Sequence, residues 1–179
     1  MRPENRPIAI RTANDALANV GVKEEGDNRG KSIEAYQASC VPPIPPGSPW
    51  CAAFVRFRMR QAARALNLTY DPTFPRSGYT PDWARWAREN NKWIPASECR
   101  EKFGLIRVGD LALFYFEGLG RIGHIGIIVN ATSERIVTIE GNTSDPDSNG
   151  DEREGDGVYR KRRTWKSLGK FGGILMVDF

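Results

Sequence analysis

The sequence predicts an α+β fold, with N-terminal helices packed on a C-terminal antiparallel sheet of about five strands. Three observations predict it. Helix-forming stretches fill the first half of the chain, and short runs rich in β-branched residues fill the second half. The length of 179 residues suffices for one core and is small for two domains. We expect one domain over residues 12–179, preceded by a flexible N-terminal tail at residues 1–11.

Four helices are expected, near residues 12–20, 30–38, 50–67 and 80–91. The third is the most clearly bounded, because prolines crowd residues 41–49 and helix-forming residues follow. One face of it is apolar, and the opposite, solvated face repeats arginine every four residues at Arg56, Arg60 and Arg64. The fourth helix begins with Thr80 as the expected cap and Pro81 at the first helical position.

Five strands are expected, near residues 111–116, 122–130, 135–140, 157–163 and 173–178. The short polar connection at 130–134 suits an antiparallel hairpin between the second and third strands. Neighbouring strands lie about 5 Å apart. Side chains near the end of the third strand can therefore reach the second.

The second of these strands contains His124, the one histidine of the chain. The ring lies in the apolar, β-branched run 121–129 and is flanked by Gly123 and Gly126. Glycine within a strand often marks a close approach of another group. A lone strand histidine usually fills the core with a satisfied ring, so position alone does not make His124 catalytic. Any imidazole acid–base chemistry here nevertheless requires it.

Cys51 opens the third helix, and on a helical projection it faces the apolar side. The unpaired N–H groups of the first turn and the positive end of the helix dipole both favour thiolate over thiol. Most free cysteines are instead small buried hydrophobic residues. Cys40 and Cys99 fit that description better than Cys51, because neither opens a helix.

Glu140 and Asn142 lie at the end of the third strand, where either side chain could contact one nitrogen of the His124 ring. A carboxylate or amide there would fix the tautomer and orientation of the ring, as a nucleophile–base pair requires. The ordinary alternative for Glu140 is a solvated carboxylate at a strand end. The sequence leaves both possibilities open.

Together these segments resemble the CHAP domain, a cysteine amidase/peptidase family of the NlpC/P60-like, papain-like group. The resemblance covers roughly residues 12–177. It rests on five motifs in the family's order: Pro-Trp-Cys-Ala-Ala-Phe-Val (49–55), Val-Gly-Asp-Leu-Ala-Leu-Phe (108–114), Gly-His-Ile-Gly-Ile-Ile-Val (123–129), Glu-Gly-Asn-Thr (140–143) and Gly-Val-Tyr-Arg-Lys-Arg (157–162).

The resemblance implies a thiol-dependent hydrolase of peptidoglycan, either an N-acetylmuramoyl-L-alanine amidase or a peptide-stem endopeptidase. It makes Cys51 the nucleophile, His124 the general base, Glu140 the orienting residue and Asn142 an accessory catalytic residue. The glutamine that precedes the cysteine in papain-like enzymes is missing, so the second oxyanion donor is not identified. Two alternatives remain: an amidase on a small cellular amide resembling glutathionylspermidine, or a non-enzymatic wall-binding module.

No cofactor is expected. A weak calcium-loop pattern spans residues 145–156, and its twelfth position is Asp156 where the pattern requires Glu. The ordinary alternative is a long polar loop between strands, and we expect no metal in the site.

The net charge of +4 is modest, and basic runs such as 160–163 are expected to be solvated rather than to bind nucleic acid. The N-terminus has no apolar core of signal-peptide length, and no segment could span a membrane. We expect a monomer made in the cytoplasm that reaches the cell wall by lysis-coupled release or injection.

Overall fold

A computed structural model describes residues 5–69, 73–145 and 155–177. Its helices are α1 (Asn5–Leu17), α2 (Lys31–Ala38), α3 (Cys51–Ala65), α4 (Thr80–Glu89) and the short α5 (Ala96–Cys99). Its strands are β1 (Trp93–Pro95), β2 (Leu111–Phe116), β3 (Arg121–Ala131), β4 (Arg135–Thr143), β5 (Gly157–Thr164) and β6 (Gly173–Leu175). The predicted α+β class is confirmed.

The six strands form one antiparallel sheet in the order β1-β6-β2-β3-β4-β5. The expected hairpin of β3 and β4 is present, with Ile127 opposite Ile139. The prediction of about five strands missed β1, because its three residues are too few to show a pattern of alternation. The last strand ends at Leu175, short of the expected 173–178.

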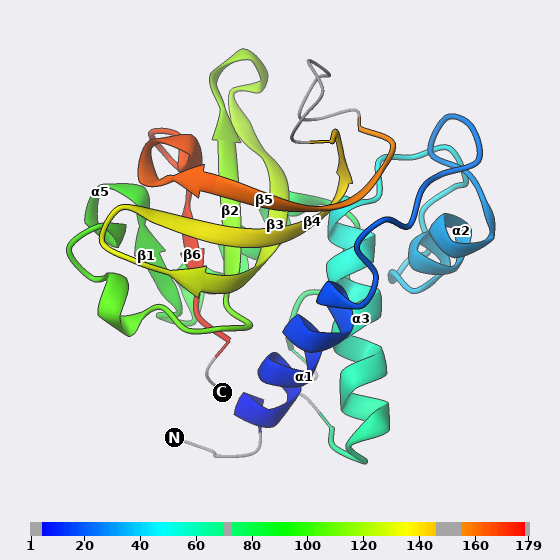
Figure 1. Ribbon diagram of the computed structural model, residues 1–179, viewed down its shortest axis with the longest axis horizontal. Coiled ribbons are helices and arrows are strands. Elements are labelled where there is room, and N and C mark those ends of the chain that lie inside the picture. The colour runs from blue at the N-terminus through cyan, green and yellow to red at the C-terminus, as the bar shows by residue number, and fades with distance from the viewer. Residues whose placement is uncertain (1–4, 70–72, 146–154, 178–179) are drawn as a thin grey trace.

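Helix α3 connects the two layers, since it contacts α1, α2, β3 and β4. Figure 1 shows α1 and α3 on the same side of the sheet, with α2 beyond α3. The main core lies between these helices and the sheet and includes Phe54, Met59 and Ile125. A second apolar cluster covers the other sheet face, where Phe114 and Trp165 are buried.

The expected tail at residues 1–11 is wrong for residues 5–11, which form the first half of α1. Pro7 falls in the first turn, where a missing N–H breaks no helical bond. Ile8 and Ala9 are buried, and Arg6 donates to the carbonyl of Val108 at 2.7 Å. Residues 1–4 lie outside the described residues.

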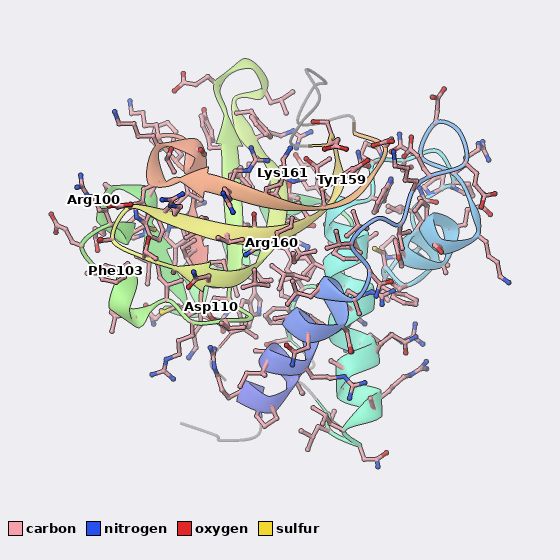
Figure 2. All side chains as sticks on the ribbon, viewed as in Figure 1. Arg100, Phe103, Asp110, Tyr159, Arg160 and Lys161 are labelled. Atoms are coloured by element: carbon pink, nitrogen blue, oxygen red, sulfur yellow. The ribbon has the colours of Figure 1, made fainter. Side chains whose placement is uncertain are left out.

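Asp110 fastens the start of β2 to both ends of the described chain (labelled in Figure 2). Its buried carboxylate accepts from the N–H groups of Val177 at 3.0 Å and Arg107 at 2.8 Å, and it pairs with Arg6 at 3.3 Å. The preceding Gly109 has a φ of +92°, and a Cβ there would come within 2.4 Å of the carbonyl oxygen of Ala9. The Gly-Asp motif therefore lets α1 lie directly against the sheet.

Two local predictions are corrected. The N-cap position of α4 is Tyr79 rather than Thr80, and the Thr80 hydroxyl donates instead to the carbonyl of Ile122 on β3. Arg56 is buried rather than solvated, and Leu68 and Arg76 line the same hollow beside it. Burial, aided by the charges of Arg76 and Arg60, lowers the pKa of Arg56 to about 10.

Candidate active site

The imidazole of His124 is held on β3, where it is 2 % exposed. The residue lies opposite Phe114 of β2, and the two rings are 5.7 Å apart at a tilt of 38°. The apolar neighbours Ile125 and Ile127 belong to the main core, whereas His124 packs against Phe114. The stiff strand and the flanking ring fix the position of the imidazole.

Glu140 of β4 is the residue that contacts this ring. His124 Nε2 and Glu140 Oε2 are 2.9 Å apart, and the Thr138 hydroxyl donates to Glu140 Oε1 at 2.5 Å. Gly126 makes room for the carboxylate, because a Cβ there would lie 2.7 Å from Glu140 Cγ. The predicted reach from strand to strand is therefore present, and Glu140 is fully buried rather than solvated.

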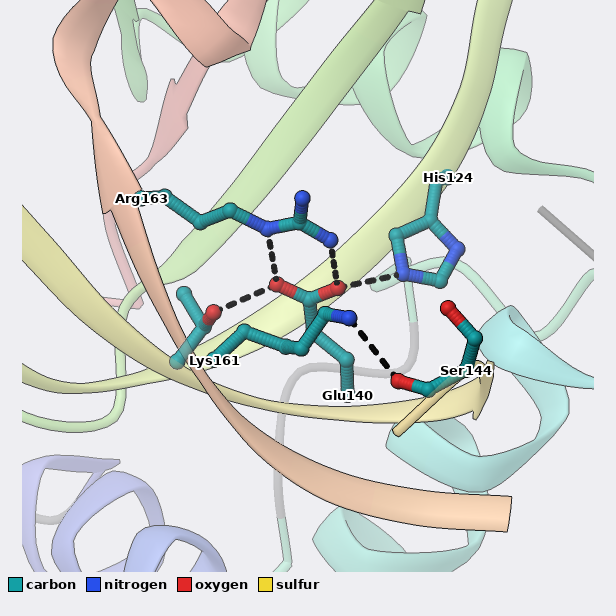
Figure 3. A network of polar contacts seen from close by, with 6 residues as sticks. His124, Glu140, Ser144, Lys161 and Arg163 are labelled. Atoms are coloured by element: carbon teal, nitrogen blue, oxygen red, sulfur yellow. Dashed lines mark hydrogen bonds and ion pairs between the residues drawn. The ribbon is translucent and has the colours of Figure 1, made fainter. Parts of the chain in front are cut away.

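Arg163 of β5 holds the opposite side of the Glu140 carboxylate, as Figure 3 shows. Its Nε donates to Oε1 at 3.0 Å and its Nη2 to Oε2 at 2.7 Å, a two-point ion pair. The guanidinium also lies over the Phe114 ring, 5.2 Å from its centre.

Arg163 is not among the residues predicted for the site, because the basic run 160–163 is expected from the sequence to be solvated. Lys161 and Arg163 are in fact buried, whereas Arg160 and Arg162 are exposed. The sequence signal that could have identified Arg163 is the period-two alternation of a strand, which places Lys161 and Arg163 on one face and Arg160 and Arg162 on the other. Lys161 satisfies its charge by donating to the carbonyl of Ser144 at 2.8 Å (Figure 3).

These contacts set opposite pKa shifts on the two buried groups. Burial alone would lower the pKa of His124, but hydrogen bonds to Cys51 and Glu140 and their charges outweigh it and raise the pKa from 6.5 to about 9. Burial alone would raise the pKa of Glu140, but His124 and Arg163 hold it well below its ordinary value. The arrangement therefore favours an imidazolium beside a carboxylate.

Cys51 brings its thiol to the same ring from the first turn of α3. It is a hydrogen-bonding partner of His124, and because Nε2 faces Glu140, Nδ1 is the nitrogen left for the thiol. The first backbone bond of the helix joins Phe54 N–H to the carbonyl of Trp50, so the Cys51 N–H has no helical partner. Cys51 is 7 % exposed and borders a cleft of about 330 Å³.

Asn142 has a different position from the other predicted site residues. Its Oδ1 accepts from the backbone N–H of Trp50 at 2.6 Å, and its own φ is +56°. The adjacent Gly141 lets α3 approach β4, since a Cβ there would lie 2.7 Å from the Trp50 ring. Asn142 thus ties the end of β4 to the residue that precedes Cys51.

The other two cysteines are far less suited to nucleophilic chemistry. Both are buried, and burial raises the pKa of Cys40 to about 11 and that of Cys99 to about 12. A thiol with so high a pKa is protonated near neutral pH. This agrees with their expected role as small buried residues.

Most of the calcium-loop pattern at 145–156 falls on residues 146–154, outside the described residues. Within the described ranges, no group of three or more His, Cys, Asp or Glu side chains is placed to hold a metal ion. None of the helices in the described part of the chain is long and apolar enough to cross a membrane.

A cysteine at a helix start, a buried histidine on a neighbouring strand and a carboxylate behind it define the class of cysteine amide hydrolases with a papain-like arrangement. The sequence profile of the CHAP domain matches residues 44–142, more than half of the chain. The chain belongs to the CHAP family, a family of cysteine amidases and peptidases. Searches among curated proteins and among solved structures found no match.

Family membership makes the protein a cysteine-dependent amide hydrolase, and CHAP domains commonly act on peptidoglycan. The matched region contains all four predicted site residues, Cys51, His124, Glu140 and Asn142. It ends before β5, so Arg163 lies beyond it.

Proposed function

We propose that this protein cleaves an amide bond of peptidoglycan, as an N-acetylmuramoyl-L-alanine amidase or a stem-peptide endopeptidase, with Cys51 as the nucleophile. The observation that supports this most is the buried row of Cys51, His124 and Glu140, whose thiol end borders the cleft. The family's common use of peptidoglycan supports the substrate.

In the first half of the reaction, the Cys51 thiolate attacks the carbonyl carbon of the scissile amide. The Cys51 N–H at the start of α3 is placed to donate to the developing oxyanion. As the tetrahedral intermediate collapses, the His124 imidazolium gives its proton to the leaving amine. A thioester between substrate and Cys51 remains, and the amine product departs neutral.

In the second half, neutral His124 takes a proton from water as the water oxygen attacks the thioester carbonyl. Collapse of this intermediate breaks the carbon–sulfur bond, releases the acid product and restores the thiolate–imidazolium pair. Glu140 stabilises the imidazolium and fixes its tautomer through Nε2. Asn142 acts as an accessory residue by holding the backbone at Trp50, which sets the position of Cys51.

Digestion of purified sacculi tests this proposal. Reduced wild-type protein and the Cys51→Ala variant are incubated with sacculi, and the soluble products are analysed by mass spectrometry. We expect fragments from the wild type alone, and their masses would identify the bond. Loss of activity in Cys51→Ala with an unchanged melting temperature would assign the loss to chemistry rather than folding.

Intact sacculi after treatment with folded, reduced wild-type protein would contradict the proposal. Turnover of glutathionylspermidine in the same preparation would then support the small-amide alternative, and sedimentation with sacculi without cleavage would support a wall-binding role. The cytoplasmic synthesis, delivery by lysis or injection, and monomeric state stay predictions.

A further inference from the structure

The cleft beside Cys51 has mostly uncharged walls and a single cationic side chain. Ile44, Gly78 and Tyr79 lie along it, and of the described residues that line it, Arg121 is the one with a cationic side chain. Gly78 allows the side chain of Ile44 to pack directly against the backbone, since a Cβ at residue 78 would lie 2.7 Å from Ile44 Cγ2. A substrate that enters the cleft therefore meets one fixed cation.

The guanidinium of Arg121 is held in place but not neutralised. Its Nη1 donates to the carbonyl of Ile122 at 3.0 Å, and its centre lies 5.2 Å from the ring centre of Tyr79. Within the described ranges, no carboxylate forms an ion pair with it. Stacking on Tyr79 orders the side chain in advance, so less rotamer entropy is lost when it binds a ligand.

The chemistry of this group selects a carboxylate. A planar guanidinium offers parallel N–H donors that match the two oxygens of a carboxylate, and its hydrogen bonds are charge-assisted. Partial burial and the uncharged walls strengthen such a pair relative to one in water. Arg121 has donors beyond the one that binds Ile122.

The position of Arg121 places such a carboxylate near the bond that is cleaved. Arg121 lines the same cleft as Cys51 and lies three residues from His124 on β3, so the Cα atoms of Arg121 and His124 are at most about 10 Å apart. An extended peptide advances about 3.5 Å per residue. A carboxylate on Arg121 would therefore belong to a substrate residue within about three positions of the scissile amide.

We propose that Arg121, stacked on Tyr79, is a carboxylate-binding subsite, so that the enzyme prefers amides with a free carboxylate within about three residues of the scissile bond. The inference rests on the proposed function and narrows its substrate class. Stem peptides present such carboxylates either free or amidated, and the subsite would distinguish the two forms.

The test compares soluble disaccharide–peptide fragments that differ only in whether the stem carboxylates are free or amidated. Wild type, Arg121→Gln and Arg88→Gln are assayed on both forms. Arg88 is the matched control, because it stacks on Trp93 at 4.6 Å and donates to the carbonyl of Phe171 but does not line the cleft.

For the wild type we expect kcat/KM to be about 10- to 100-fold higher on the free acid, mainly through KM. Arg121→Gln should remove that preference by slowing cleavage of the acid form alone, and Arg121→Lys should keep part of it. Arg88→Gln should leave the ratio unchanged. A preference that survives in Arg121→Gln, or none in the wild type, would overturn the inference and leave the hydrolase assignment intact.

If the wild type cleaves neither form, the proposed function fails. A binding measurement then tests separately whether Arg121 recognises a carboxylate. Calorimetric titration of Cys51→Ala and Cys51→Ala/Arg121→Gln with both fragments measures recognition without turnover. Tighter binding of the acid form that depends on Arg121 supports the subsite, whereas equal or absent binding of both forms overturns it.

Discussion

The carboxylate of Glu140 contacts two ionisable side chains, those of His124 and Arg163. It accepts from His124 and from both donors of Arg163 while fully buried. A buried carboxylate with this many donors stays ionised and keeps the facing ring oriented. Changes to either of its two charged neighbours should therefore alter the pH range of activity as well as the rate.

Glu140→Gln should lower kcat/KM about 100-fold or more, since the ring loses the group that fixes its tautomer. The alkaline limit of the pH–rate profile should move to lower pH, because Glu140 raises the pKa of His124 to about 9. Profiles on a soluble fragment measure both effects. Glu98→Gln, which breaks only an exposed pair with Lys102, is the control and should match the wild type.

Arg163→Met should move the alkaline limit in the opposite direction, to higher pH. Removing this cation leaves the full charge of Glu140 facing His124, which favours the imidazolium further. The unpaired buried carboxylate should also lower the free energy of unfolding by about 3 kcal/mol.

Two further variants separate the positioning role of Arg163 from a structural one. Arg163→Lys keeps the charge and should leave the pH limit in place while the rate falls. Lys161→Met removes a buried cation from the same face of β5 and should destabilise the fold without moving the pH profile. Identical profiles for Arg163→Met and Lys161→Met would refute the positioning role.

At the scale of elements, α1 and α3 form one unit against the sheet. Ile8 of α1 packs with Ala62 and Ala63 of α3, and Arg6 reaches the turn before β2. Helix α3 in turn presents Cys51 to β3 and β4. The stability of the N-terminal helix therefore bears on the position of Cys51, the proposed nucleophile.

Ile8→Ala should lower the free energy of unfolding by about 2–4 kcal/mol, because the side chain is 1 % exposed and its loss leaves a cavity. Ile10→Ala on the same helix is the control and should change it by less than about 0.5 kcal/mol, since Ile10 is 45 % exposed. Urea unfolding curves measure both. Equal effects would mean that α1 does not pack as described.

At the scale of the whole molecule, the buried pair links folding to pH. His124 has a folded pKa raised from 6.5 to about 9, so its stabilisation is complete below pH 6.5 and disappears as the pH rises through 9. Glu140 has a lowered folded pKa, so its stabilisation is complete above its ordinary pKa of 4.5 and disappears as the pH falls below it. Stability should therefore be greatest between these limits, near pH 5–6.5.

Melting temperatures measured from pH 4 to pH 9.5 should fall on both sides of that window. The alkaline loss should reach up to about 3 kcal/mol, from a shift of this size in one group. In His124→Gln the decline between pH 6.5 and 9 should be largely absent. A wild-type stability that stays constant from pH 6.5 to 9 would mean that the imidazolium is not favoured in the folded protein.

Sequence patterns predicted the long elements well and the ends of the chain poorly. Helices α2, α3 and α4 and strands β2 to β5 start and end within a few residues of the prediction. The start of helix α1 was predicted seven residues late, at residue 12 instead of Asn5. The polar and proline residues Arg6 and Pro7 are typical of a flexible tail, and the sequence does not show that Ile8 packs against α3. Local periodicity does not report which apolar side chains find a partner.

The sequence by itself determined the α+β class, the order of the nucleophile and histidine elements, and the placement of Cys51 in a first helical turn, because these follow from composition and local spacing. Only the tertiary structure decided that Glu140 rather than Asn142 contacts the His124 ring, and that Arg163 is a buried partner of Glu140 rather than a solvated residue. Those outcomes depend on strand register and on which sheet face is covered, because a shift of one residue moves every side chain of a strand to the opposite face.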